Sequence, residues 1–157
     1  MDDLFGHELP EWDNDRFRRE DDEGEDWKIR PRWETAERLY AHCSEIFKLC
    51  RLLTDSLSGE WQIAEQQMIM SNISIVGAKI VGAASADLYI LQVEKAAIIR
   101  QNMRELREQL IMLEMMQPEN SRYCQLILQE IERFKGVFKI WVSHFKRDDV
   151  EDDWGVF

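Results

Sequence analysis

The chain has 157 residues, of which 45% are hydrophobic and 32% are charged, and its formal net charge is −11. This balance is typical of one globular domain with a sizeable core and excludes a wholly disordered chain. The charge is uneven: residues 1–30 sum to −7, residues 148–157 to −5, and residues 31–147 to +1. We therefore expect two acidic tails on a nearly neutral body.

Residues 1–31 are predicted to form an acidic arm that is flexible or depends on a partner for its order. The arm has charge runs such as REDDEGED (19–26) and no sustained helical period. It also contains scattered aromatics, so that LFGHELPEW (4–12) is expected to dock or to present apolar side chains. Asp2 and Asp3, with no apolar run behind them, predict that no secretory signal is present.

The pattern becomes helical at Trp33, after Pro31, which is a typical helix start signal. Apolar residues then recur at steps of three and four as far as Leu57, which predicts one core-facing surface. That surface comprises Trp33, Ala36, Leu39, Tyr40, Cys43, Ile46, Phe47, Cys50, Leu53, Thr54 and Leu57.

A second helix is predicted from near Glu60 or Trp61, after the break SLSGE (56–60), to about Ala86. Asp87 is interpreted as a cap or as the pivot of a tight connection. The inner side of this helix is predicted to carry Ala64, Met68 and Ile75.

The third helix is predicted from about Leu88 to Met116, and the fourth from QPEN (117–120) to near Lys146 and Arg147. The apolar stripe predicted to face the core on the third helix comprises Tyr89, Ala96, Ile99, Met103, Leu106, Leu110 and Leu113. That of the fourth helix comprises Tyr123, Ile127, Ile131, Phe134, Phe138, Trp141 and Phe145. Its aromatic residues are more numerous than one inward stripe needs, which predicts apolar surface to bury elsewhere.

No period-two alternation marks a strand anywhere in the chain. Four helices of similar length with short connections predict an all-α fold, an antiparallel up-down-up-down four-helix bundle over 32–147. The acidic arm (1–31) and an acidic-aromatic C-terminal tail (148–157) are expected to be flexible.

Small residues recur every four positions in the second helix, at Ser74, Ala78, Gly82 and Ala86. A strip without bulk lets another backbone approach closely, and helical glycines need such compensation. Two interpretations stay open: a tight contact inside the bundle, or a contact with another subunit or a ligand.

Catalytic, cofactor and metal chemistry have no supporting pattern. No nucleophile elbow, phosphate-binding loop, dinucleotide fingerprint or Cys-x-x-Cys is present, and no His has a Glu three residues before it. Cys43, Cys50 and Cys124 fall in apolar patterns and are interpreted as buried thiols of a reduced, cytoplasmic protein. The longest apolar run, 73–86, contains Lys79 and is too short to cross a membrane.

Arg100, Arg104 and Arg107 share one face of the third helix. One interpretation is a solvated face on which Arg104 pairs with Glu108, four residues on. The alternative is a patch for an anionic partner, either nucleic-acid phosphates or the acidic tails of the protein itself.

The tail ends in EDDWGVF (151–157), where Trp154 and Phe157 follow a run of acids. We expect these aromatics either to dock in a groove of the same or a neighbouring subunit, or to form a short motif for another protein. Gly155 is predicted to provide a local turn.

The stretch ISIVGAKIVGAASADLYILQVEKAAIIRQNMRELREQL (73–110) resembles the bacterial four-helix-bundle proteins linked to ribosomal-RNA intervening sequences, a group that includes accessory proteins of retroelements. With Ile80 on the second Ile of the family's Ser-Ile-Pro-x-x-Ile-x-Glu-Gly-like stretch, Gly77 and Gly82 replace its Pro and Glu. The resemblance implies a non-catalytic bundle that assembles as a homo-oligomeric ring, typically of five subunits.

The sequence therefore predicts a non-enzymatic assembly module that forms a homo-oligomer and contacts partners through its tails. The alternative is a nucleic-acid-associated accessory protein that uses the arginine face.

Overall fold

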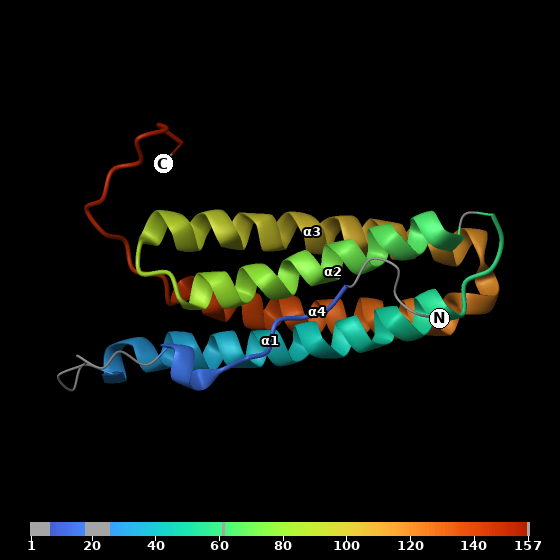
Figure 1. Ribbon diagram of the computed structural model, residues 1–157, viewed down its shortest axis with the longest axis horizontal. Helices are drawn as coiled ribbons and strands as arrows, with labels where there is room; N and C mark the ends of the chain where they lie inside the picture. Colours follow the sequence, from blue (N-terminus) through green and yellow to red (C-terminus); the bar gives the residue numbers. More distant parts are fainter. Residues whose placement is uncertain (1–6, 18–25, 61, 157) are drawn as a thin grey trace.

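The computed structural model describes residues 7–17, 26–60 and 62–156, and these form four long helices (Figure 1). They are α1 (Asp26–Asp55), α2 (Gln62–Ala84), α3 (Tyr89–Met116) and α4 (Ser121–Ser143). Two short 3-10 turns, η1 (Asn14–Phe17) and η2 (Pro118–Asn120), accompany them. No strand occurs in these ranges, and the predicted all-α fold is confirmed.

The four helices lie side by side along the long axis of the molecule (Figure 1). α1 contacts α2 and α4, and α3 contacts the same two helices. At one end, the α1–α2 connection is tied to the α3–α4 connection by side chains. Ser56 Oγ donates to Asn120 Oδ1 at 2.8 Å, and Gln117 Nε2 donates to the Ser58 carbonyl at 3.3 Å.

The core is built from the stripes predicted for α1, α3 and α4. On these helices the predicted positions are buried, or are half-buried and packed against the core, with the exception of Tyr89, which is half-buried at the start of α3. Three of the four predicted faces are therefore confirmed. The largest fully buried side chains of these three helices are Leu39, Ile46, Leu53, Ile99, Leu106, Leu110, Ile127 and Trp141.

The predicted inner side of α2 is wrong. Ala64 is exposed, and Met68 and Ile75 are 56% and 39% exposed. Because α2 is apolar nearly all round, its periodicity does not reveal which side faces the other helices. The buried side instead carries Ile69, Met70, Ile73, Val76, Ile80, Val81, Ala83 and Ala84.

The apolar character of α2 has a further consequence. By length and composition alone, Gln62–Ala84 passes as a membrane-spanning helix, yet 56% of its most apolar window is buried within this structure. This burial is the pattern of a core helix.

Two helix ends differ from the prediction. α1 begins at Asp26 rather than at Trp33, so Pro31 lies inside the helix. Pro31 is the sixth residue of the helix, where its missing N–H removes one i→i−4 hydrogen bond. The Thr35 hydroxyl donates to the Pro31 carbonyl at 2.6 Å. α4 ends at Ser143, before the two basic residues that were expected to terminate it.

The aromatic residues of α4 pack on one another rather than facing outward. Ring centroids of Phe134 and Phe138 lie 6.3 Å apart, those of Phe138 and Trp141 5.8 Å, and those of Trp141 and Phe145 4.8 Å in an edge-on contact. Trp141 is fully buried. Each ring covers part of the next. Phe138 and Phe145 nevertheless stay half-buried, so aromatic surface is left open at this end of the chain, and its burial against another surface stays a prediction.

The three cysteines are buried free thiols, as predicted. Burial raises the pKa of the Cys43 thiol to about 12 and that of Cys124 to about 11, and it also raises the pKa of Cys50. These thiols are core side chains in their neutral form, since a thiolate in this apolar setting would lose its hydration.

The raised thiol pKa values predict a loss of stability in alkali. In the unfolded chain the thiols ionise near pH 9.0, whereas in the folded chain they stay protonated, so stability is intact below pH 9 and falls above it. Each thiol should lower the free energy of unfolding by about 1.4 kcal/mol per pH unit between pH 9 and its folded pKa. Urea unfolding under reducing conditions measures this slope. Cys50→Ala should show a shallower decline above pH 9, and equal slopes in the two proteins would contradict the assignment.

Candidate functional site

An open groove runs along the seam between α3 and α4 and has a volume of about 430 Å³. Its floor is apolar and its two edges are basic. The floor is made by Met103, Ile131, Phe134 and Phe138, and the edges carry Arg100, Arg104 and Arg107 from α3 and Glu132, Lys135 and Lys139 from α4. We call this feature the basic groove.

Helical spacing explains how the sequence builds the basic groove. Arg100, Arg104 and Arg107 stand at i, i+4 and i+7, so they follow one edge of α3. Lys135 and Lys139 stand at i and i+4 on the facing edge of α4. All five basic residues are exposed, whereas Met103 and Phe134 beneath them are only 6% and 3% exposed.

Most cations of the basic groove make no ion pair among the described residues, although Arg100 and Arg104 also line the cleft that contains Glu94, Glu105, Glu108 and Asp152. Lys135 Nζ lies 3.1 Å from Glu132 Oε2, but the ion pairs among the described residues do not include Arg100, Arg104, Arg107 or Lys139. Within this part of the chain, the predicted pairing of Arg104 with Glu108 is therefore not formed. Five cations and one carboxylate along an apolar floor favour an anionic occupant with apolar groups.

The C-terminal tail leaves the end of α4 and crosses to the start of α3, where it rises past the helix (Figure 1). The Tyr89 backbone N–H donates to Asp148 Oδ2 at 2.8 Å, and the Val150 N–H donates to Asp148 Oδ1 at 3.2 Å. A carboxylate at a helix N-terminus satisfies an otherwise unpaired donor and interacts favourably with the helix dipole. Asp148 thus caps the Tyr89 N–H from the tail, a cap that the sequence does not indicate, and it anchors the tail.

Beyond this anchor the tail folds into a tight turn. The carboxylate of Asp152 accepts from the backbone N–H groups of Trp154, at 3.1 Å, and Val156, at 2.7 Å. Gly155 has a φ of 70°, a left-handed conformation that favours glycine, which confirms the turn predicted there.

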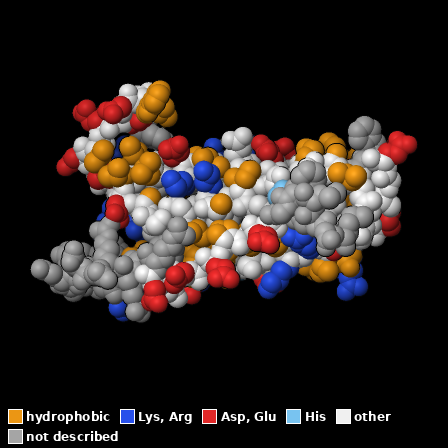
Figure 2. Space-filling model, viewed as in Figure 1, with side chains coloured by type: hydrophobic (Ala, Val, Ile, Leu, Met, Phe, Trp, Pro, Cys, Tyr) orange, Lys and Arg blue, Asp and Glu red, His pale blue; other side chains and the backbone are white. Residues whose placement is uncertain are grey.

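The turn presents its apolar side chains to solvent. Trp154 is 90% exposed and Val156 is 73% exposed, and Figure 2 shows hydrophobic and acidic side chains together on this projecting segment at upper left. An open cleft of about 870 Å³ separates these residues from the outer face of α3. Phe157, the other predicted contact residue, lies outside the described residues. The tail of a single chain therefore leaves its aromatic anchor uncovered.

The small-residue strip of α2 does not meet the basic groove or the tail. Ser74 and Gly82 are half-buried, Ala78 is exposed and Ala86 is buried. The space beside Gly82 is occupied by the aliphatic part of the Lys95 side chain from α3, rather than by another backbone. The structure thus places the strip at the edge of the α2–α3 contact.

The described part of the N-terminal arm packs on α1 and α2 (Figure 1). Arg51 Nη2 donates to the His7 carbonyl at 2.7 Å, and His7 Nε2 lies 3.1 Å from the Ser71 hydroxyl. Tyr40 donates its hydroxyl hydrogen to the Pro10 carbonyl and lies against the Trp12 ring, with centroids 5.4 Å apart.

Gly77 makes room for this arm, because a Cβ there would clash with the Leu9 side chain. In the sequence, Gly77 was singled out only because it stands at the position of the family's Pro. Leu9 and Trp12 are the sequence feature that points to this role, because apolar side chains in the arm need a surface without bulky side chains on which to pack.

Gly77→Ala should therefore displace the arm while leaving the helices intact. Alanine raises helix propensity by about 1 kcal/mol, but its methyl group occupies the Leu9 position. The expected result is faster proteolysis near residues 7–12 and a red shift of tryptophan emission. Gly136→Ala is the matched control, since Gly136 lies in α4 with nothing within 4 Å of the place that a methyl group would take, and it should only stabilise. Unchanged proteolysis in Gly77→Ala would show that Leu9 does not rest there.

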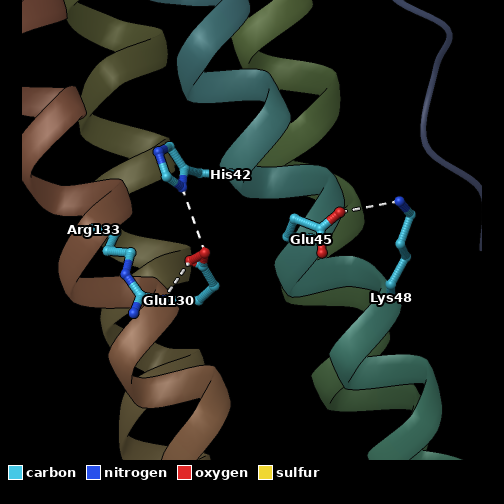
Figure 3. Close-up of polar contacts among 5 residues, drawn as sticks. All are labelled: His42, Glu45, Lys48, Glu130 and Arg133. Atoms are coloured by element: carbon cyan, nitrogen blue, oxygen red, sulfur yellow. Dashed lines mark hydrogen bonds and ion pairs between the residues drawn. The ribbon is translucent and has the colours of Figure 1, made fainter.

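A polar cluster links α1 to α4 away from the basic groove (Figure 3). His42 Nδ1 lies 3.6 Å from Glu130 Oε1, and Arg133 Nη1 lies 3.3 Å from Glu130 Oε2. Across residues 7–17, 26–60 and 62–156, no three His, Cys, Asp or Glu side chains come together in a way that would hold a metal ion. We interpret the cluster as an interhelical contact.

A second exposed apolar surface lies where α2 begins and α3 ends. Met68, Met112 and Met116 surround a hollow of about 130 Å³ and are 56%, 63% and 59% exposed. Figure 2 shows hydrophobic side chains at this end of the molecule. We call these three residues the methionine patch. Sequence reasoning missed it, because Met68 was assigned to the core.

Comparison with protein-family models, with curated proteins and with solved structures finds no match to this chain. The surfaces described above are therefore the basis for its proposed function.

Proposed function

We propose that this protein is a non-enzymatic helical assembly module that forms a homo-oligomer and contacts partners through its acidic-aromatic tail. Its body is proposed to be an antiparallel up-down-up-down bundle. The ties between the two connections at one end support this topology, as does the Asp148 bond to the start of α3 at the other.

The observation that carries the proposal is the exposed methionine patch. Apolar surface of this kind on a folded chain is typical of protein–protein contact. Methionine suits such a contact, because its flexible and polarisable side chain adapts to the shape of a partner. A second copy of the chain can cover this patch, and in a ring it does so with a different part of its surface, because a self-complementary contact closes at two copies.

The proposal also covers the size of the oligomer and the cellular location of the protein. A bacterial ring of five copies is consistent with the resemblance to the ribosomal-RNA intervening-sequence bundles. Three buried neutral thiols are consistent with a reduced cytoplasmic environment.

Light scattering of the full chain tests this proposal. We expect a defined oligomer whose dissociation constant rises at least about tenfold in Met112→Glu/Met116→Glu, since each new charge would be desolvated at the contact. Leu52→Glu is the matched control, because Leu52 is an exposed apolar residue of α1. A single-chain mass for the unmodified protein at all concentrations would refute the proposal.

A second candidate function, nucleic-acid association, is favoured by the cations of the basic groove. Phosphate binding by these residues predicts an affinity for RNA or DNA that falls steeply with salt. Replacing Arg100, Arg104 and Arg107 with Gln should abolish it and flatten the salt dependence. Arg38 and Arg122, which are exposed elsewhere, are the control pair. No binding at low salt by the unmodified protein would exclude this function.

A further inference from the structure

We propose that the basic groove of one copy receives the C-terminal tail of a second copy, with Trp154 on the apolar floor. This inference rests on the proposed homo-oligomer and names a contact that holds it together.

The two surfaces are complementary in charge and in polarity. Residues 148–157 contain five acids and no base, and the basic groove contains five bases and one acid. Trp154 and Val156 are exposed on the tail, while Met103, Phe134 and Phe138 line the groove. Covering an indole on such a floor removes on the order of 150–250 Å² of surface from water and provides aromatic and sulfur contacts.

The dimensions also agree. Arg100 and Arg107 are seven residues apart on α3, which corresponds to about 10 Å along the helix. Three residues of chain span at most about 10–11 Å, which is no longer than this edge. With Trp154 on the floor, the neighbouring acids at 151–153 would therefore lie within reach of the arginine edge.

The tail of the same chain lies across an open cleft from Arg100 and Arg104, but its Trp154 is exposed and is not seated on the apolar floor. It is anchored by Asp148 at Tyr89, and Met103 lies fourteen residues further along α3, or about 21 Å. Trp154 follows Asp148 by six residues, which span at most about 20–22 Å when fully extended. The Asp152 turn shortens that reach, so insertion within one chain would require the turn to unfold. A second copy supplies the tail without this cost.

A phosphate backbone would neutralise the cations of the basic groove but would not cover its apolar floor. Nucleic-acid phosphates neutralise Arg and Lys, whereas Ile131 and Phe134 gain nothing from them. The tail supplies anionic and apolar groups together, so it fits the basic groove better than a duplex, whose bases stay stacked inside the helix. A single strand would also offer bases to the aromatic floor, and RNA binding is therefore one of the outcomes tested below.

Each copy would then use one groove and one tail, in different places on its surface. Such a head-to-tail contact closes into a ring if the rotation between copies permits, and otherwise continues as an open chain.

Complementation between two full-length variants tests the contact. The groove variant is Arg104→Glu/Lys139→Glu, which retains a normal tail. The tail variant is Trp154→Ala/Asp153→Lys, which retains a normal groove. Each alone should have a lower oligomeric mass than the unmodified protein in light scattering. Mixed in equal amounts, they should form complexes heavier than either variant alone, because one intact groove meets one intact tail.

Two further measurements define the expected result. The mixed complex should weaken roughly tenfold between low and high salt, since the contact is charged. The control variants Arg38→Glu/Arg122→Glu and Val150→Ala should keep the mass of the unmodified protein. Far-UV circular dichroism of every variant establishes that its helices are intact, and the exposure of all substituted positions favours this.

The outcomes separate this contact from the assembly proposal. If the groove and tail variants both keep the mass of the unmodified oligomer, the tail contact is refuted and the homo-oligomer stands. If the mixture shows no mass beyond that of the separate variants, docking between copies is refuted, and docking within one chain is the remaining tail contact. If the groove variant loses RNA binding and keeps its mass, the groove is a nucleic-acid site. A single-chain unmodified protein refutes both proposals.

Discussion

Burial of one apolar stripe from each helix against the others is the constraint on which the rest of this structure depends. Trp141 shows its effect most clearly: it is fully buried, and Phe138 and Phe145 pack against its ring. Once these stripes are closed, charged residues must occupy the remaining helix faces. The seam between α3 and α4 is where long cationic side chains meet an incompletely covered floor, and this produces the basic groove.

Sequence periodicity predicted the helices and three inner faces because α1, α3 and α4 each alternate clearly between apolar and polar sides. It failed on α2, where apolar residues surround the helix and the neighbours decide which side is buried. Met68 was wrongly assigned to the core for this reason: it is 56% exposed and belongs to the methionine patch. The start of α1 was also missed, because Pro31 resembled a boundary while the helix continued through it.

The sequence predicted the arginine edge of α3 and the tail aromatics of the candidate site, but not the residues that pack opposite them. The arginine edge and the tail aromatics follow from spacing within single segments. The sequence did not predict that Lys135 and Lys139 share a groove with those arginines, because the two sets of residues face each other only once α4 packs on α3. The same limit applies to Asp148, which is distant in sequence from the helix start that it caps, and to Gly77, whose role appears only when Leu9 lies upon it.

The turn closed by Asp152 bears on how fast the proposed assembly would form. Its backbone geometry is already set in the separate chain, so little ordering would remain to be done at encounter. Opposite charges on tail and groove would guide the approach, and such guidance acts mainly on the association rate. The lifetime of the contact would instead be governed by the indole on its apolar floor. Ionic strength would then regulate the speed of assembly more than its persistence.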